Sequence, residues 1–266
     1  MKSLIIIPAR YASTRYPGKP LVSLTGATGE SRSLIQRSWD AALAVAGVDR
    51  VVVATDDDRI RDACEKFGAD VVMTSSDCVN GTERCAEAYT TLAGEFDIVV
   101  NLQGDAPLTP AWFIEDLVSA LSKDEAAEIA TPVLRCDAVS LNGFLEDRRH
   151  GRVGATTAVF DLNKRALYFS KEVIPYLGRH YKETDETPVF HHVGVYAYRP
   201  AALIDYPNWP IGPLESLEGL EQLRFMENGR HVLCVEVDAR DRQFWELNNP
   251  EDVPRLQAMM TEMGMA

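Results

Sequence analysis

No Asp or Glu precedes Glu30, although the chain of 266 residues carries a formal net charge of -13. The same stretch contains Arg10, Arg15 and Lys19 in one segment, IIIPARYASTRYPGKPL (5–21). A cationic loop on an acidic protein predicts a site for a small anion, with a plain solvated loop as the alternative. The acidic balance elsewhere argues against non-specific binding to nucleic acid or to anionic membranes.

Cysteine is scarce, and its five positions form no C-x-x-C pair. They are Cys64, Cys78, Cys85, Cys136 and Cys234. An odd number without paired spacing predicts free thiols in a reducing compartment. Long apolar runs are missing too, since no stretch approaches the roughly 20 residues of a membrane span. The short run before Pro8 is too brief for a signal peptide, so we expect a cytoplasmic protein.

Several catalytic motifs are also absent. The chain has no G-x-x-x-x-G-K-[ST] and no G-x-G-x-x-G, so neither common phosphate-binding loop is present. It has no G-x-S-x-G and no H-E-x-x-H, so nothing indicates a covalent nucleophile or a zinc peptidase. His191-His192 has no zinc-like spacing to the cysteines.

Short β-branched runs that end in polar residues predict buried strands at 3–7, 50–56 and 96–105. Helical patterns lie between them, which predicts an α/β fold with a doubly wound, mostly parallel sheet. The expected helices cover 34–46, a segment capped by Asp58 that ends at Gly68, and a segment capped by Thr82.

The second half has a more mixed pattern. Strands are expected at 154–161, 191–199 and 231–238, and one continuous helix at 213–229. In that helix Leu217, Leu220 and Leu223 have core spacing. A last helix is expected with Asn249 as its cap and Pro250 in its first position. Residues 178–190 are the best candidate for a mobile loop, and no linker or repeat divides the chain.

Ligands of doubly wound sheets bind at the carboxyl ends of the strands. The basic loop follows the first strand, and Gln103-Gly104-Asp105 ends a later one, so both are expected to face one crevice. A carboxylate facing a cationic loop is a candidate Mg²⁺ ligand for bound phosphates. The alternative is an ordinary turn aspartate, because Asp is common in turns.

Together, the motifs resemble those of the 3-deoxy-manno-octulosonate cytidylyltransferases, the enzymes that make CMP-KDO for lipopolysaccharide. The resemblance runs from about residue 3 to about residue 257. It rests on IIIPARYASTRYPGKPL, VVATDD, NGTERCAEA, VNLQGDAPL, ALYFSKEVIP, HHVGVYAYR, PLESLEGLEQLR and NNPEDV, in that order.

The resemblance implies that the anomeric hydroxyl of a sugar acid attacks the α-phosphate of CTP and that pyrophosphate leaves, with Mg²⁺ as cofactor. The implied catalytic residues are Arg10, Lys19 and Asp105, the last being the metal ligand. The implied CTP-binding residues are Ala9, Arg10, Ser13, Arg15, Lys19, Asn80, Gly81, Thr82 and Arg84. The implied sugar-binding residues are Gln103, His192, Tyr196, Glu215 and Glu218.

The resemblance also implies a homodimer and a single α/β domain over 1–266. Its nucleotide-binding part is expected at about 1–130, and its sugar-binding and dimerisation part at about 131–266. It further implies a smaller mixed β lobe for dimerisation.

Three positions depart from the family pattern. Ala106 replaces the Glu of Q-G-D-E-P, Thr157 replaces a strand lysine, and Asn248 replaces a second metal-binding aspartate. Asn248 offers Mg²⁺ only a neutral oxygen, so metal affinity should fall unless Glu251, Asp252 or another carboxylate compensates. Two alternatives therefore stay open: a paralogue that activates another acid, such as an amino-octulosonate, a nonulosonate or a non-sugar acid, and a non-catalytic nucleotide or sugar binder.

Overall fold

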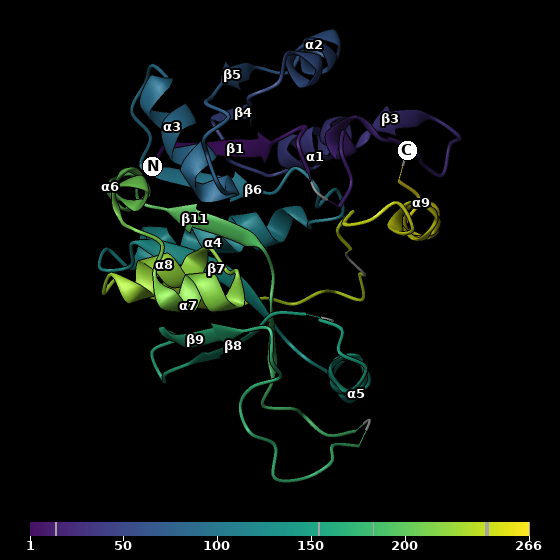
Figure 1. Ribbon diagram of the computed structural model, residues 1–266, viewed down its shortest axis with the longest axis vertical. Helices are drawn as coiled ribbons and strands as arrows, with labels where there is room; N and C mark the ends of the chain where they lie inside the picture. Colours follow the sequence, from purple (N-terminus) through teal and green to yellow (C-terminus); the bar gives the residue numbers. More distant parts are fainter. Residues whose placement is uncertain (14, 154, 183, 243–244, 266) are drawn as a thin grey trace.

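One ten-stranded sheet runs through the molecule (Figure 1). The structure is a computed structural model that describes residues 1–13, 15–153, 155–182, 184–242 and 245–265. Within these ranges the strand order is β5-β4-β1-β6-β11-β7-β10-β8-β9, and β12 also pairs with β7. The strands are β1 (Ser3–Ala9), β4 (Arg50–Thr55), β5 (Val71–Met73), β6 (Ile98–Leu102), β7 (Ile129–Arg135), β8 (Thr157–Phe160), β9 (Ala166–Ser170), β10 (Phe190–His192), β11 (Val195–Tyr198) and β12 (Val232–Glu236).

The first half of the sheet is parallel, as its continuous apolar runs predicted. Strand β1 pairs in parallel with β4 and β6, and β4 pairs in parallel with β5. The second half is mixed, since β11 is antiparallel to β6 and β7, and β8 and β9 form an antiparallel pair. The single strand expected at 191–199 is two strands, because the Val195 amide donates to the Val193 carbonyl in a tight turn. Strands β10 and β11 consequently lie on either side of β7.

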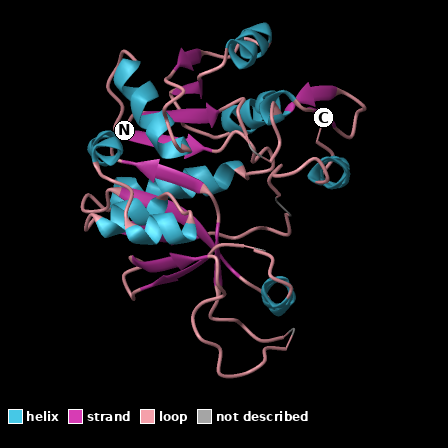
Figure 2. Ribbon diagram, in the orientation of Figure 1, coloured by secondary structure: helices cyan, strands magenta, loops and turns pink. Residues whose placement is uncertain are grey.

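Helices cover both faces of the sheet (Figure 2). On β1, Ile5 and Ile7 pack in one cluster with α1, α2 and α4, while Leu4 and Ile6 pack in another with α3, α6 and α8. The helices are α1 (Leu34–Leu43), α2 (Asp58–Lys66), α3 (Gly81–Thr91), α4 (Ala111–Lys123), α5 (Ala138–Arg149), α6 (Pro200–Asp205), α7 (Pro213–Glu218), α8 (Gln222–Glu227) and α9 (Asp252–Glu262). Short elements complete the fold: the 3-10 turns at Lys19–Leu21 and Tyr206–Asn208, and the pair β2 (Ser23–Thr25) and β3 (Ser31–Ser33). Within the described ranges, no helix has the length and apolar character needed to cross a bilayer.

Helix caps differ from the sequence-based expectation at three places. Asp57, not Asp58, caps α2 by accepting from the Arg59 amide, and Asn80, not Thr82, caps α3 by accepting from the Glu83 amide. Each true cap lies just outside its helix, where its extended backbone lets the side chain reach back. Helix α9 begins at Asp252, two residues later than expected from Pro250.

The helix expected over 213–229 is broken into α7 and α8. Gly219 ends α7 with a φ of 61°, which reverses the chain before α8 begins. Leu223 is fully buried, but Leu217 is 83% exposed, so its expected place in the core was wrong. The break turns the acidic side chains of this segment in different directions.

Helix α9 closes the molecule against its N-terminal segment. Its residues Leu256, Met259 and Met260 pack with Leu24 and Leu34 in a separate core cluster. Figure 1 shows α9 and the C-terminus beside β3 and α1, far along the chain from them. This packing fixes the loop before α9, which carries Asn248.

The loop expected to be mobile has no helix or strand at 178–189 among its described residues. Glu183 within it lies outside the described residues, as does Gly154 at the start of the strand expected at 154–161. The described part of that strand is β8, from Thr157 to Phe160.

Candidate active site

Three of the sequence motifs meet at the carboxyl ends of β1 and β6. A Cβ added to Gly104 would lie 2.8 Å from the Pro8 carbonyl oxygen, so the turn after β6 touches the end of β1. A Cβ added to Gly81 would lie 3.0 Å from Gln103 Nε2, so the start of α3 touches the same turn. Glycine is needed at 104 because backbone occupies the space of a side chain.

The basic loop and the Q-G-D turn are joined by an ion pair. Lys19 Nζ donates to Asp105 Oδ2 over 2.5 Å, and both side chains are largely buried. The Leu247 amide donates to the Asp105 carbonyl oxygen over 2.9 Å, which brings the loop before α9 to the same place. The expectation that the basic loop and the Q-G-D turn lie together is therefore confirmed for Lys19 and Asp105.

The other expected residues of the basic loop have contacts of their own. Arg15 donates from Nη2 to Asn248 Oδ1 over 3.1 Å. Ala9 is buried at the end of β1, and Arg10 follows it with an exposed side chain. Ser13 accepts from the Tyr16 amide and so shapes the loop.

Glu246, which motif comparison did not single out, lies in the same site. A Cβ added to Gly194 would lie 3.6 Å from Glu246 Oε1 and 4.0 Å from Gln103 Cγ, so both side chains border this glycine. Asn248 donates from Nδ2 to Glu246 Oε2 over 3.5 Å. Burial, and after it the negative charge of Asp105, raises the pKa of Glu246 to about 7.

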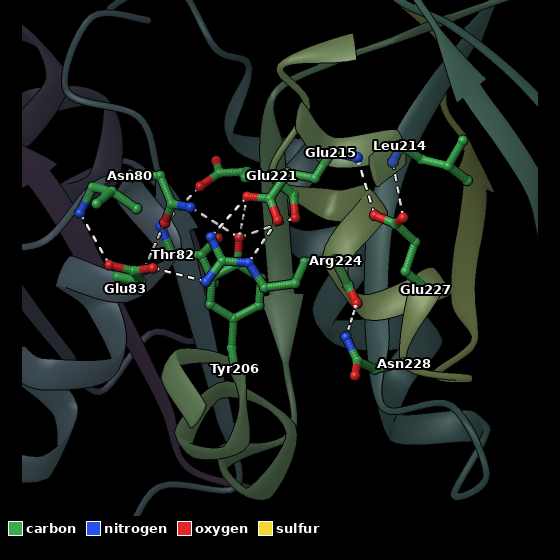
Figure 3. Close-up of polar contacts among 11 residues, drawn as sticks. Asn80, Thr82, Glu83, Tyr206, Leu214, Glu215, Glu221, Arg224, Glu227 and Asn228 are labelled. Atoms are coloured by element: carbon green, nitrogen blue, oxygen red, sulfur yellow. Dashed lines mark hydrogen bonds and ion pairs between the residues drawn. The ribbon is translucent and has the colours of Figure 1, made fainter. Parts of the chain in front are cut away.

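Gln103 contacts a second acid that the sequence analysis missed, Glu221. Gln103 Nε2 donates to Glu221 Oε1 over 3.2 Å, and the Thr82 amide donates to Glu221 Oε2 over 2.9 Å. Burial raises the pKa of Glu221. Figure 3 shows Glu221 between the start of α3 and the buried Tyr206. Glu221 belongs to the PLESLEGLEQLR motif, and this membership is the sequence signal that could have identified it as a site residue.

The expected nucleotide-binding residues of α3 are engaged within the protein. Asn80 donates from Nδ2 to the Tyr206 hydroxyl over 2.9 Å, and the Thr82 hydroxyl shares a hydrogen bond with the Tyr198 hydroxyl. Arg84 is buried, where it donates to Thr74 Oγ1 over 2.6 Å and lies 3.4 Å from Asp56 Oδ1. These contacts leave Gly81 as the α3 residue that lies directly against the Q-G-D turn.

Glu215 and Glu218, both expected to bind the sugar, face different partners. Arg224 donates to Glu215 from Nε over 2.6 Å and from Nη2 over 2.8 Å, and its Nη1 donates to Glu83 over 2.7 Å (Figure 3). Glu218 points to the end of β9, where it accepts from Ser170 Oγ over 2.7 Å and from the Lys171 amide. Neither contacts Gln103 in the described structure, whereas Glu221 does.

His192 and Tyr196, also expected to bind the sugar, are buried beneath the site. The Thr131 hydroxyl donates its one hydrogen to the Val195 carbonyl over 2.8 Å, so His192 Nε2 donates to Thr131 Oγ1 over 2.9 Å. Burial lowers the pKa of His192 to about 3, with His191 as a smaller cause. The Tyr196 hydroxyl donates to Gln222 Oε1 over 3.1 Å.

Two of the three departures from the family pattern are accommodated in the fold. Ala106 is buried, and its amide donates to the Gln103 carbonyl in the turn after β6. Thr157 is buried, donates to the Glu172 carbonyl over 2.7 Å and accepts from the Ile174 amide. Asn248 is the departure that contacts the basic loop, through Arg15, and it follows Leu247, whose amide donates to Asp105.

The arrangement offers cations for an anionic ligand and hard oxygen atoms for a metal. Across the described ranges, no three His, Cys, Asp or Glu side chains gather as a self-sufficient metal site. Mg²⁺ commonly binds through one or two carboxylates and completes its shell with substrate phosphates and water. The oxygens of Asp105 and Asn248 beside two cations therefore fit a Mg²⁺–phosphate site.

Comparison with known proteins gives a consistent answer. A sequence model of the family described as cytidylyltransferase matches residues 4–232. The chain is 42% identical over 264 residues to a 3-deoxy-manno-octulosonate cytidylyltransferase of Maricaulis maris, covering 99% of both chains. It is 41% identical over 254 residues to an 8-amino-3,8-dideoxy-manno-octulosonate cytidylyltransferase of Shewanella frigidimarina, covering 95% of this chain and 96% of that one.

The fold is similar to that of a solved relative. The structure of CMP:2-keto-3-deoxy-manno-octonic acid synthetase complexed with CTP matches with a TM-score of 0.83 and 34% identity. It covers 99% of this chain and all of that one. The chain therefore belongs to the cytidylyltransferase family, and the resemblance to 3-deoxy-manno-octulosonate cytidylyltransferases that its motifs indicated is confirmed.

Proposed function

We propose that the protein couples CTP to 3-deoxy-manno-octulosonate, or to a close analogue, giving the CMP-sugar and pyrophosphate. The observation that carries this proposal is the Lys19–Asp105 pair at the carboxyl ends of β1 and β6. The Leu247 amide links Asp105 to the loop in which Asn248 contacts Arg15. A triphosphate has the charge and length to engage several such cations at once. The names of the full-length relatives supply the substrate class.

The chain's own residues would act mainly by position and charge. Lys19, Arg15 and the exposed Arg10 would hold the triphosphate of CTP and stabilise charge on the departing pyrophosphate. Ala9, Ser13 and the start of α3, from Asn80 to Thr82, would border the nucleotide. Arg84 is buried against Asp56, so we propose that it supports the residues that border the nucleotide.

The acid-sugar side of the site would lie around Gln103. We propose that Gln103 and Glu221 face the sugar hydroxyls and that His192 and Tyr196 support the floor beneath them. Glu215 would act through Arg224, and Glu218 through the end of β9, as positioning residues.

We propose Mg²⁺ as the cofactor, held by the Asp105 carboxylate with the Asn248 amide oxygen beside it. The bound ion would withdraw electron density from the phosphates and neutralise charge that develops during transfer. Release of the Lys19 ammonium from Asp105 toward a phosphate would accompany loading of the site.

The test is pyrophosphate release from CTP and Mg²⁺ over a panel of acidic sugars. Turnover with 3-deoxy-manno-octulosonate supports the proposal. Turnover only with the 8-amino sugar or with another acid supports a paralogue. This alternative is included because the sequence is almost as similar to the Shewanella 8-amino-sugar enzyme as to the Maricaulis enzyme. CTP binding without release over the whole panel contradicts the proposal and favours a binder.

The oligomeric state and the cellular location are two further proposals. We propose a homodimer, because large apolar side chains are exposed at Leu162, Leu167, Tyr176 and Leu217 in the second half. Light scattering of the purified protein tests it, and a monomeric mass contradicts it. We propose a cytoplasmic location, because the five cysteines are unpaired and a reducing compartment keeps such thiols free.

A further inference from the structure

Within the described ranges Glu246 forms no ion pair, although it lies near another acid, Asp105. Asp105 is paired with Lys19 at 2.5 Å. Among the described residues, no Lys, Arg or His nitrogen lies within 4.0 Å of the Glu246 carboxylate. A half-buried carboxylate without a cation is costly, and a second negative charge nearby adds to the cost. The Glu246 carboxylate therefore makes no ion pair of its own within the described residues, and a cation bound between it and Asp105 would neutralise both carboxylates.

The amide of Asn248 is oriented to suit this carboxylate. Its oxygen accepts from Arg15, and its nitrogen faces Glu246 Oε2 at 3.5 Å. An aspartate at 248 would turn an oxygen toward Glu246 and repel it. The neutral residue at 248 and the acid at 246 are thus matched to each other.

The backbone holds Glu246 close to the metal-binding aspartate. The Leu247 amide donates to the Asp105 carbonyl over 2.9 Å, which fixes the residue next to Glu246 against the Q-G-D turn. Leu247 itself is fully buried in the cluster that packs α9. Glu246 therefore reaches the site from an anchored segment.

We propose that Glu246 is the second carboxylate of the divalent-cation site, supplying the negative charge that the neutral Asn248 lacks. This inference rests on the proposed function, since it concerns the Mg²⁺ that the reaction would use. Asp105 and Glu246 would hold the ion from the Q-G-D turn and from the loop before α9. Asn248 would keep Arg15 and Glu246 in place.

The test measures Mn²⁺ binding to the full-length protein saturated with CTP and without sugar. Free Mn²⁺ is followed by its electron paramagnetic resonance signal, with CTP alone as the baseline. Glu246→Gln should weaken Mn²⁺ binding about 10–100-fold, as loss of metal-site partners typically does. Glu262→Gln, the same change on an exposed residue near the end of α9, should leave binding unchanged.

A double variant moves the carboxylate by two residues. Glu246→Gln with Asn248→Asp should recover most of the lost Mn²⁺ affinity, because it restores one acid to the site. Unchanged affinity in folded Glu246→Gln, or absence of Mn²⁺ binding by the unaltered protein with CTP, would overturn the inference. Circular dichroism establishes that each variant is folded.

Turnover of the unaltered protein separates this inference from the proposed function. If Glu246→Gln loses Mn²⁺ affinity while no acidic sugar is turned over, the metal site stands and the proposed function fails. If the protein turns over a sugar while Glu246→Gln binds Mn²⁺ normally, only the inference on Glu246 fails.

Discussion

The Leu247 amide and the Asp105 carbonyl are joined by a 2.9 Å hydrogen bond across 142 positions of the chain (247 minus 105). This bond places the loop before α9 beside the turn after β6. Lys19 reaches the same turn from the opposite end of the sequence. The site is thus assembled from the start, the middle and the end of the chain.

Lys19 is expected to stabilise negative charge during the reaction. Lys19→Met should lower kcat/KM for CTP about 10²–10³-fold, in the range found when one preorganised electrostatic donor is removed. The matched control is Lys66→Met on the exposed end of α2. Steady-state pyrophosphate release measures both variants, and equal activity of the two would argue against this role.

Gly104 is expected to tolerate no side chain. Gly104→Ala should lower activity at least tenfold and destabilise the fold by about 1–3 kcal/mol, since its Cβ would meet the Pro8 carbonyl at 2.8 Å. Gly143→Ala is the control, because space around Gly143 in α5 is open. That change should instead stabilise by about 0.5–1 kcal/mol, as Ala does in helices. Urea denaturation gives both values, and opposite signs are the expected outcome.

Arg224 is expected to be essential for folding rather than chemistry. Arg224→Met leaves Glu215 and Glu83 without their buried partner and should cost about 3–5 kcal/mol of unfolding free energy. Arg230→Met also removes a bridge between two acids, Glu128 and Asp205, but at the surface, so its cost should stay below about 1 kcal/mol. Similar losses in denaturant titrations of the two variants would contradict the difference in burial.

His192 is expected to make the fold sensitive to mild acid. Its pKa is about 3 in the folded protein and near 6.5 in an unfolded chain, so below pH 6.5 the unfolded state binds more protons. The stability contributed by neutral His192 is complete above about pH 6.5 and is lost as the pH falls. Between pH 6 and 4, this one group makes the unfolding free energy fall by up to about 1.4 kcal/mol per pH unit of acidification.

His192→Asn should remove that part of the slope, whatever its effect on stability at pH 7. His150→Asn, on the exposed end of α5, should keep the slope of the unaltered protein. Denaturant titrations at several pH values measure the slopes. An unchanged slope in His192→Asn would mean that the buried histidine is not the responsible group.

Much of the site was predictable because it follows from strand order. Lys19 and Asp105 each follow a buried apolar strand, and parallel strands bring their carboxyl ends together. The roles of Glu221 and Glu246 were not predictable in this way. They depend on the turn at Gly219 and on the Leu247 hydrogen bond, and both are long-range consequences of packing.

The motif alone also could not show which of its acidic side chains contacts the site and which ones support it from outside. Glu215, Glu218 and Glu221 stand three residues apart in one motif, yet they face Arg224, Ser170 and Gln103 respectively. A continuous helix would have placed all three on one side. The reversal at Gly219 distributes them instead, and only Glu221 reaches the Q-G-D turn.

The packing of α9 has a consequence for oxidative damage. Burial raises the pKa of Cys64, Cys78, Cys136 and Cys234 to about 12 and that of Cys85 well above its usual value, so the thiols are poor targets for peroxide. The thioethers that seat α9 behave differently, since Met263 and Met265 are only half-buried at its end. Their conversion to polar sulfoxides would loosen the helix that anchors the loop of Glu246. Peroxide would then inactivate this enzyme through methionine, and methionine sulfoxide reductase, rather than a thiol reductant, would restore it.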